Sequence, residues 1–387
     1  MSRIVQLANF VTPSSGGLRT ALAHLVTGYA AAGHDVVQVL PGERAAREQT
    51  PWGCRITVPA RQIPGTGYRM MRSGEALTRL LGDLAPDRLE VHDRTTLRGL
   101  GRWASAEGVP SLVVSHERLD QLLRQWLTPR LPLDDWADRS NRTLAAGFDQ
   151  VVCTTAWAEQ EFARIGVTNL RRIPLGVDLA GFQPPDGPAA PGDSGTPGGS
   201  GASDGKVLLV MASRLSKEKR PDLAIAAVAE LRRRGVPARL VIAGDGPLRA
   251  GLERQARGLP VELLGFVHDR ARLAALLGAA DVVLAPGPVE TFGLAALEAL
   301  ACGTPVVASC HSALPEVLGD AGRAAASAPW CIADAVQDLL ALPVEARRAA
   351  ARKRAERFPW SATVEGFLRT HNLPVGPVPD RLPVRTP

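Results

Sequence analysis

Two glutamates, Glu290 and Glu298, stand eight residues apart in the otherwise apolar stretch PVETFGLAALEALACGTP. If one helix ran through both, its rise would separate their Cα atoms by about 12 Å. Two carboxylates that act as acid and base around one bond lie closer together, about 5 to 10 Å apart. The spacing therefore favours two separate contacts to one elongated ligand. An internal ion pair to an arginine or lysine is the alternative for each glutamate.

The residues around Glu298 predict a helix over 292–302, closed by Gly303 and then Pro305. Glu290 lies just ahead of this helix, beside first-turn amides that have no partner within it. Those amides could hold phosphate or hydroxyl oxygens, and a buried Glu298 needs hydroxyl donors to offset its desolvation. The amides in question belong to Thr291, Phe292, Gly293 and Leu294.

Two cations follow a predicted strand in the stretch SRLSKEKRPD. Arg214 and Lys219 lie on a loop before a helix that we expect to begin near Pro221. Cations at the carboxyl end of a strand suit a diphosphate, with arginine as a planar fork and lysine as a point charge. Lys217 and Arg220, in the same loop, are better explained as solvated charges.

Two glycine turns and one histidine complete the candidate set. Gly16 and Gly17 separate the first predicted strand from the first predicted helix, where the backbone can approach an anion, although packing alone is the alternative. In IAGDGPLR, Gly244 and Gly246 follow another predicted strand without forming a G-x-G-x-x-G fingerprint, and we expect them in the wall of a ligand site. His116, in VVSHERLD, ends a further predicted strand, a position where a lone histidine is usually structural.

The elements that must position these residues repeat a strand–helix–strand pattern twice. The pattern predicts an α/β fold with two Rossmann-like domains, at 1–182 and 206–356, and a ligand cleft between the carboxyl ends of their strands. Between the domains, residues 183–205 are rich in Gly, Pro and Ser and predict a flexible linker. A last helix over 359–371 is expected to pack back on the N-terminal domain, and the Pro-rich tail 372–387 to be poorly ordered.

The composition narrows the class of protein. The net charge of +6 suits an anionic small molecule, an acidic membrane surface or nucleic acid, but it also fits an Ala/Arg-rich proteome. None of the five cysteines forms a C-x-x-C pair, which argues against a zinc site and a disulfide framework. No apolar run approaches the length of a spanning helix, so we expect a cytoplasmic protein whose membrane contact, if any, is peripheral.

Two segments are candidates for lipid or acceptor binding. Residues 68–81 predict an amphipathic helix that could dock on anionic lipid, although such spacing more often marks a surface helix on its own core. Trp126 and Leu127 could line an acceptor groove. The helix would place Arg69, Arg72 and Arg79 beside Met70, Met71, Leu77 and Leu80.

In their order and spacing, the N-terminal GG loop, RLSKEK, AGDGP and ETFGLAALE resemble family four of the retaining glycosyltransferases, which have the GT-B fold. The resemblance covers nearly the whole chain. It implies that Arg214 and Lys219 bind the diphosphate of a nucleotide sugar, with Gly17 closing on it. It also implies that Glu290 binds hydroxyls of the sugar and that Glu298 binds the ribose.

The same resemblance places the backbone of 265–267, with Phe266 and Val267, beside the nucleotide base. His116 matches the family histidine near the transferred sugar, although Glu117 follows it where the family more often has aspartate. The implied catalytic residues are His116, Arg214, Lys219 and Glu290.

More narrowly, VQLANFVTPSSGGLRTA, VVSHERLD, VVCTT and LAPGPVETFGLAALEALACGTP are similar to actinobacterial GDP-mannose-dependent α-mannosyltransferases of phosphatidylinositol mannosides or glucuronosyl diacylglycerol. This similarity implies transfer with retention to a lipid-linked acceptor, with peripheral contact at the inner face of the plasma membrane. Side chains would supply the charge and no D-x-D motif is present, so no metal is expected and the nucleotide sugar is a co-substrate. The long linker at 183–205 differs from the compact connection that is usual between the two domains of those enzymes.

Three other functions remain open at this point. A UDP-sugar-dependent transferase acting on a soluble or natural-product acceptor would share every motif. A non-hydrolysing sugar epimerase shares the fold but lacks this pattern of cations and paired glutamates, and a non-catalytic nucleotide-sugar-binding protein would not need His116. Nucleic acid is disfavoured because the arginines are dispersed along the chain.

Overall fold

The computed structural model describes residues 1–11, 16–63, 68–126, 133–185 and 206–378. Most of the predicted linker, Leu127, the side chain of Trp126 and the end of the Pro-rich tail lie outside this part. The chain forms two compact units: unit 1 is Met1–Gly176 with Trp360–Pro387, and unit 2 is Val177–Pro359. The border therefore falls six residues before the predicted end of the first domain at 182, and the last helix belongs to unit 1.

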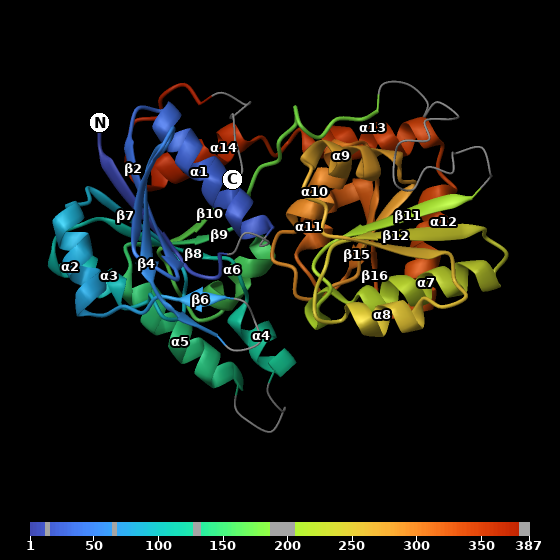
Figure 1. The fold of residues 1–387 in the computed structure, drawn as a ribbon, viewed down its shortest axis with the longest axis horizontal. Coiled ribbons are helices and arrows are strands. Elements are labelled where there is room, and N and C mark those ends of the chain that lie inside the picture. Colours follow the sequence, from blue (N-terminus) through green and yellow to red (C-terminus); the bar gives the residue numbers. More distant parts are fainter. Residues whose placement is uncertain (12–15, 64–67, 127–132, 186–205, 379–387) are drawn as a thin grey trace. The chain divides into compact units, whose positions relative to one another are not determined.

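Unit 1 is built on an eight-stranded sheet with the order β10-β9-β8-β7-β1-β2-β4-β3 (Figure 1). All neighbours pair in parallel except β3 and β4. The strands are β1 Arg3–Ala8, β2 Asp35–Gly42, β3 Ala46–Thr50, β4 Gly53–Pro59, β7 Arg88–His92, β8 Ser111–Ser115, β9 Gln150–Cys153 and β10 Leu170–Arg172, and β5 Arg61–Gln62 pairs with β6 Arg69–Met70. The helices are α1 Gly17–Ala31, α2 Glu75–Leu84, α3 Leu100–Ala106, α4 Leu119–Trp126, α5 Leu133–Gly147, α6 Ala156–Ala163 and α14 Trp360–Thr370.

Unit 2 is built on a six-stranded, fully parallel sheet with the order β13-β12-β11-β14-β15-β16. Its strands are β11 Val207–Ala212, β12 Ala238–Ala243, β13 Val261–Gly265, β14 Val282–Ala285, β15 Val306–Ser309 and β16 Gly322–Ala325. Its helices are α7 Pro221–Arg233, α8 Arg249–Gln255, α9 Arg270–Ala279, α10 Leu294–Ala301, α11 Leu314–Leu318, α12 Pro329–Leu340 and α13 Val344–Ala355, with short 3₁₀ turns at Lys217–Lys219 and Gly319–Ala321.

The strand order explains where each unit can bind a ligand. In unit 2 the chain runs from β11 outward to β12 and β13, then returns to build β14, β15 and β16 on the other side of β11. In unit 1 the chain runs from β1 outward to β2, β3 and β4, then returns to build β7, β8, β9 and β10 on the other side of β1. In such doubly wound sheets the ligand binds beyond the carboxyl ends of the strands, at the point where the order reverses. That point lies between β11 and β14 in unit 2 and between β1 and β7 in unit 1.

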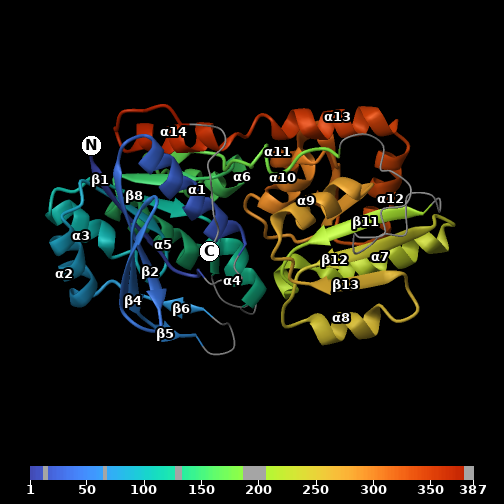
Figure 2. The same ribbon diagram turned by 45° about the horizontal axis from the view of Figure 1, so that its top comes forward.

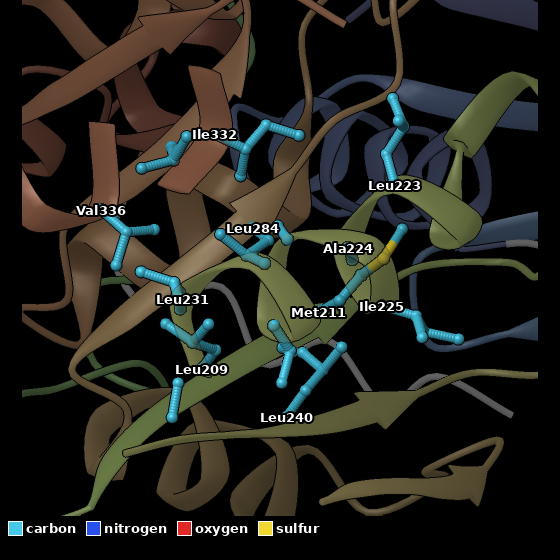
Figure 3. Close-up of a cluster of buried hydrophobic side chains, with 14 of the residues drawn as sticks. Leu209, Met211, Leu223, Ala224, Ile225, Leu231, Leu240, Leu284, Ile332 and Val336 are labelled. Atoms are coloured by element: carbon cyan, nitrogen blue, oxygen red, sulfur yellow. The ribbon is translucent and has the colours of Figure 1, made fainter. Parts of the chain in front are cut away.

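The core of unit 2 shows why the strands read as continuous apolar runs. Leu209 and Met211 from β11 pack with Leu240 from β12 and with side chains of α7 and α12, among them Leu231 and Val336 (Figure 3). Because helices cover both faces of a parallel sheet, its strands are apolar on both sides. The packing fixes the strands and leaves their carboxyl ends to carry polar loops.

The helix α14 packs inside unit 1, against α1, and the two helices lie side by side in Figures 1 and 2. The His24 ring stacks on Trp360 with 4.2 Å between ring centroids. Gly28 is the point of closest approach, because a Cβ there would stand 2.4 Å from Cγ2 of Val364. A glycine on α1 therefore sets how closely the C-terminal helix can approach.

Two predicted helices have different starts in the structure. The amphipathic helix expected over 68–81 begins only at Glu75, and Met71 ahead of it is buried. Hydrogen bonds to distant segments hold these residues extended, since Met71 N–H donates to Asn9 Oδ1 at 2.9 Å and Ser73 N–H to Thr96 O at 3.0 Å. The helix expected over 292–302 is α10, Leu294–Ala301, because the residue before it has a positive φ of 81°. Among the described residues, no helix is both long and apolar enough to cross a membrane.

We expect Gly28→Ala to lower the free energy of unfolding by about 1–3 kcal/mol, because the new methyl group overpacks Val364. Gly82→Ala on α2 is the matched control, since a Cβ there meets nothing within 4 Å and should stabilise the helix by about 0.5–1 kcal/mol. Urea unfolding measures both. The double variant Gly28→Ala/Val364→Ala should recover part of the loss that Gly28→Ala causes; no recovery would show that α14 does not set this limit.

Candidate active site

The loops after β11 and β14 meet in unit 2 through an ion pair between Lys219 Nζ and Glu290 Oε2. Both side chains are about a quarter exposed, at 27% and 25%. A Cβ at Gly287 would stand 2.6 Å from Glu218 O and 3.1 Å from Lys219 Cα, so only glycine allows the loops this close. Sequence reasoning named both ionic residues, and the structure brings them together at the reversal point of the sheet.

Arg214 lies on the same loop and also has a carboxylate partner. Its Nη2 donates to Glu218 Oε1 at 2.8 Å, and Ser216 Oγ donates to the same oxygen. Burial raises the pKa of Glu218, but the Ser216 and Arg214 hydrogen bonds outweigh it, so the pKa lies below the usual range. The site therefore holds two cations, Arg214 and Lys219, each already oriented by a carboxylate.

The glycines of the AGDGP turn position the Arg214 loop. Gly244 has a φ of 147°, and a Cβ there would stand 1.8 Å from Ser213 O. A Cβ at Gly246 would stand 2.5 Å from Leu215 O, and Leu215 N–H donates to Asp245 O at 3.0 Å. The two glycines thus let the loop after β12 lie directly against the loop that carries the cations.

Gly293 fixes the entry to α10. Its positive φ of 81° suits glycine, and a Cβ there would stand 2.4 Å from Cδ2 of Leu314 and 3.1 Å from Cγ of Glu290. The carbonyl of Glu290 accepts from Ala313 N–H at 2.8 Å. The side chain of Phe292 is buried, so that residue offers a ligand only its backbone, and the helix itself starts at Leu294.

Glu298 lies on α10 with its side chain 13% exposed, and Arg270 Nη2 stands 3.6 Å from its Oε1. Burial raises the pKa of Glu298 to about 7, although the Arg270 charge opposes the shift. The Arg270 guanidinium in turn lies 4.9 Å from the ring centroid of Phe182. The ion-pair alternative is thus realised for both glutamates. Arg270 was missed by sequence reasoning, because no motif marks it.

Phe266 and Val267 follow β13, at the same carboxyl edge of the sheet. The Phe266 ring is 38% exposed and meets His268 edge-to-face with 4.6 Å between centroids. An exposed aromatic ring in this place offers a stacking surface for a flat group.

In unit 1, Gly16 precedes α1 and Gly17 is its first residue; both are exposed. A Cβ at Gly16 would meet no heavy atom of the described chain within 4 Å, so packing does not require glycine there.

His116 is half-buried after β8 and is the first member of a hydrogen-bonded series of polar side chains whose other members, among them His92 and Glu90, are buried. Its Nε2 lies 2.7 Å from Nδ1 of His92, and Nε2 of His92 lies 2.6 Å from Oε1 of Glu90. The other Glu90 oxygen accepts from Tyr29 Oη at 2.7 Å and contacts His371 Nε2 at 3.0 Å. Sequence reasoning missed Glu90 and His92, since one charged residue in a strand carries no pattern.

Burial is the largest influence on the pKa values of His116 and Glu90 in this series. It lowers the pKa of His116 to about 3, with the His92 charge as the next cause, so the imidazole is neutral at neutral pH. Burial also pushes the pKa of Glu90 upward, but hydrogen bonds from His371 and His92 outweigh it and keep that pKa below its usual range. Glu90 is therefore a carboxylate that can only accept, which makes His92 Nε2 the donor between them.

Across the described residues, no group of three or more His, Cys, Asp or Glu side chains has an arrangement that could hold a metal ion.

Because the pKa of Glu298 is about 7 in the folded chain and 4.5 is its ordinary value, we expect this residue to lower stability as pH rises. The folded state binds more protons than the unfolded state between pH 4.5 and 7, so the loss accumulates across that window to about 3 kcal/mol and then levels off. Thermal unfolding from pH 4.5 to 8 measures it. Glu298→Gln should flatten the curve, and an unchanged pH slope in this variant would contradict the assignment.

Comparisons with known proteins agree with this geometry. A family model described as Glycosyl transferase 4-like domain matches residues 16–176, and one described as Glycosyl transferases group 1 matches residues 197–358. The chain is 50% identical over 371 residues to the GDP-mannose-dependent alpha-(1-6)-phosphatidylinositol dimannoside mannosyltransferase of Mycobacterium tuberculosis, which covers 95% of each chain. It is 30% identical over 337 residues to the D-inositol 3-phosphate glycosyltransferase of Nocardia farcinica, over 81% of this chain and 68% of that one.

Solved structures give the same fold. Sucrose-phosphate synthase from Thermosynechococcus elongatus matches with a TM-score of 0.75 at 21% identity, over 96% of this chain and 98% of that one. Anabaena HepE in complex with UDP and glucose matches with a TM-score of 0.70 at 16% identity, over 96% and 100%. The chain belongs to the glycosyltransferases with a 4-like and a group 1 domain, and it is an enzyme of the GT-B fold.

Proposed function

We propose that this chain transfers mannose from GDP-mannose to a hydroxyl of a phosphatidylinositol-mannoside-type glycolipid, with retention and without a bound metal. The 50% identity over 95% of both chains supports the sugar, the base and the acceptor class. The contact between Lys219 and Glu290 is the observation that carries the donor site, because it joins a phosphate-binding cation to a hydroxyl-binding carboxylate at the reversal point of the sheet.

The reaction breaks the bond between the sugar's anomeric carbon and the diphosphate oxygen, and the bond's electron pair leaves with the diphosphate. Arg214 and Lys219 stabilise the charge that develops on that oxygen. The acceptor hydroxyl forms the new bond on the same face, and its proton passes to the departing phosphate oxygen. Glu290 accepts hydrogen bonds from hydroxyls of the sugar and orients Lys219, while Glu298 accepts hydrogen bonds from the ribose hydroxyls.

Residues at the ends of other strands complete the proposed donor site. The backbone of Phe266 and Val267 lies beside the base, and the amides of Phe292, Gly293 and Leu294 face the phosphates. Gly244 and Gly246 support the cationic loop, and Gly16 and Gly17 approach the donor from unit 1. His116, being neutral, hydrogen-bonds to the transferred sugar and does not act as a cation.

The protein acts, in this proposal, at the inner face of the plasma membrane through peripheral contact. Co-sedimentation with liposomes that contain or lack anionic lipid tests this contact. If the protein binds neither kind of liposome, the proposed membrane contact is contradicted.

A second candidate is transfer from a UDP-sugar to a soluble acceptor. The 30% identity to a D-inositol 3-phosphate glycosyltransferase favours the acceptor of this candidate and does not bear on its donor. Thermal stabilisation and slow hydrolysis, measured with GDP-mannose, UDP-glucose and UDP-N-acetylglucosamine, separate the two. Stabilisation by GDP-mannose alone supports the first, and stabilisation by a UDP-sugar alone supports the second.

We expect Lys219→Ala and Arg214→Ala each to reduce transfer at least about 100-fold, because each removes a charge that faces the departing diphosphate. Lys217→Ala is the matched control, an exposed lysine in the same loop, and should retain activity. Steady-state transfer with urea unfolding measures activity and folding separately. Near-normal transfer in both variants would contradict the diphosphate assignment.

We expect His92→Phe to lower kcat about tenfold or more while the KM for the donor changes little, because His92 fixes which nitrogen of His116 carries the proton. Nitrogen-15 NMR of the histidine rings should show a changed tautomer population at His116. His34→Phe, another buried histidine of unit 1, controls for the loss of an imidazole. An unaltered tautomer would leave His92 with a structural role only.

A further inference from the structure

A pocket of about 440 Å³ opens in unit 1, close to the reversal point of its sheet. Its lining includes Arg94 and Arg98, on the segment that follows β7 directly, and Arg102 on α3. Arg72 contributes from the segment before α2, and Trp136 from α5. The volume is within the range of about 300–1,000 Å³ typical of small-molecule sites.

Four arginines and no carboxylate line this pocket. Arg94 is buried and fully engaged, since it pairs with Glu161 and donates to Ser115 Oγ and to Glu117 O at 2.9 and 2.6 Å. The other three, Arg72, Arg98 and Arg102, are exposed, and within the described part of the chain none of them forms an ion pair.

That lack of partners distinguishes these three arginines from several others of unit 1. Arg79 pairs with Glu75, and Arg124 with Asp134. Cations gathered around one cavity repel one another, and an anion in the cavity would relieve that repulsion. Guanidinium groups match the oxygens of phosphate in geometry as well as in charge.

Hydrogen bonds connect the backbone segments that carry Arg72 and Arg98. Asn9 Nδ2 donates to Thr96 Oγ1 at 2.9 Å and to Asp93 Oδ2 at 2.6 Å, which ties the loop after β1 to the loop after β7. Ser73 N–H donates to Thr96 O at 3.0 Å. A Cβ at Gly99 would stand 2.6 Å from Ser73 Oγ, so the two pocket walls approach as closely as glycine permits. The cations therefore project from a fixed backbone.

The pocket also has an apolar wall and a link to His116. Trp136 is 55% exposed, although large aromatic side chains are usually more buried, and it lines the cavity together with Ser140. Aromatic rings in such places suit the C–H face of a polyol or sugar ring. Arg94, in the pocket lining, contacts both residues that flank His116 in the chain, Ser115 and Glu117.

We propose that this pocket binds the phosphate group of the acceptor, with Arg72, Arg98 and Arg102 on the phosphate oxygens and Trp136 against the polyol ring that bears it. The inference rests on the proposed function for its acceptor class. The phosphate could belong to a lipid headgroup or to a free polyol phosphate, and the chemistry of recognition is the same for both.

The test measures binding to the full chain without any donor. Titration calorimetry with glycerophosphoinositol, and separately with inorganic phosphate, is compared between the native chain and Arg98→Gln/Arg102→Gln. Loss of two guanidinium contacts should weaken binding of glycerophosphoinositol about 30- to 100-fold. Arg47→Gln, an exposed arginine on β3 outside the pocket, should bind as the native chain does. Trp136→Ala should weaken glycerophosphoinositol binding while leaving inorganic phosphate binding unchanged.

Flotation with phosphatidylcholine vesicles, with and without phosphatidylinositol, separates the two sources. Binding of phosphatidylinositol vesicles alone, lost in the double variant, assigns the pocket to a lipid headgroup; binding of soluble glycerophosphoinositol, lost in the same way, assigns it to the phosphorylated polyol itself. Equal binding by the double variant and the native chain, or no binding of any probe by the native chain, would overturn the proposal. Nucleotide-sugar stabilisation of the double variant is recorded in parallel, so that failure of the donor assignment is seen independently.

Discussion

The ion pair between Lys219 and Glu290 joins two loops that lie 71 residues apart in the sequence. It exists because the strand order of unit 2 reverses between β11 and β14, which sets the loops after these strands side by side. Glycine at position 287 then lets the second loop press on the first. The proposed donor site depends on this contact, because the ion pair fixes the cation proposed to bind phosphate and the carboxylate proposed to bind sugar hydroxyls relative to each other.

The two units share one architecture but differ in the charges at the reversal point of the sheet. In unit 2 the reversal point gathers cations that carboxylates already orient, at Arg214 and Lys219. In unit 1 the corresponding point gathers Arg72, Arg98 and Arg102, which form no ion pair among the described residues, beside Arg94, which pairs with Glu161. A cation that is already paired exchanges one anion for another when an anionic ligand binds, whereas an unpaired cation gains its first anionic partner. The electrostatic gain on binding should therefore be larger in unit 1 than in unit 2.

The two-unit fold and the residues of the candidate donor site in unit 2 could largely be predicted from the sequence. The motifs lie at the ends of strands, and in a doubly wound sheet the strand ends lie close together where the strand order reverses. The motifs predict Arg214, Lys219 and Glu290; Lys219 and Glu290 form an ion pair, and Arg214 lies on the same loop as Lys219. Arg270, Glu90 and His92 could not be found in this way, since each is a single residue whose meaning comes from a partner elsewhere in the fold. The predicted start of α2 was wrong for a related reason. The periodicity of 68–81 is helical, but hydrogen bonds from Met71 to Asn9 and from Ser73 to Thr96 hold the first part of this segment extended.

The return of the chain to unit 1 through α14 has a consequence for how the protein is made. Unit 2 is one continuous segment, Val177–Pro359, while unit 1 needs residues from both ends of the chain. On the ribosome, unit 2 is therefore complete before the helix that covers Gly28 on α1 has been synthesised. The first unit to begin is the last to be finished, and until then the face of α1 that carries His24 and Gly28 lacks the cover that Trp360 and Val364 of α14 provide.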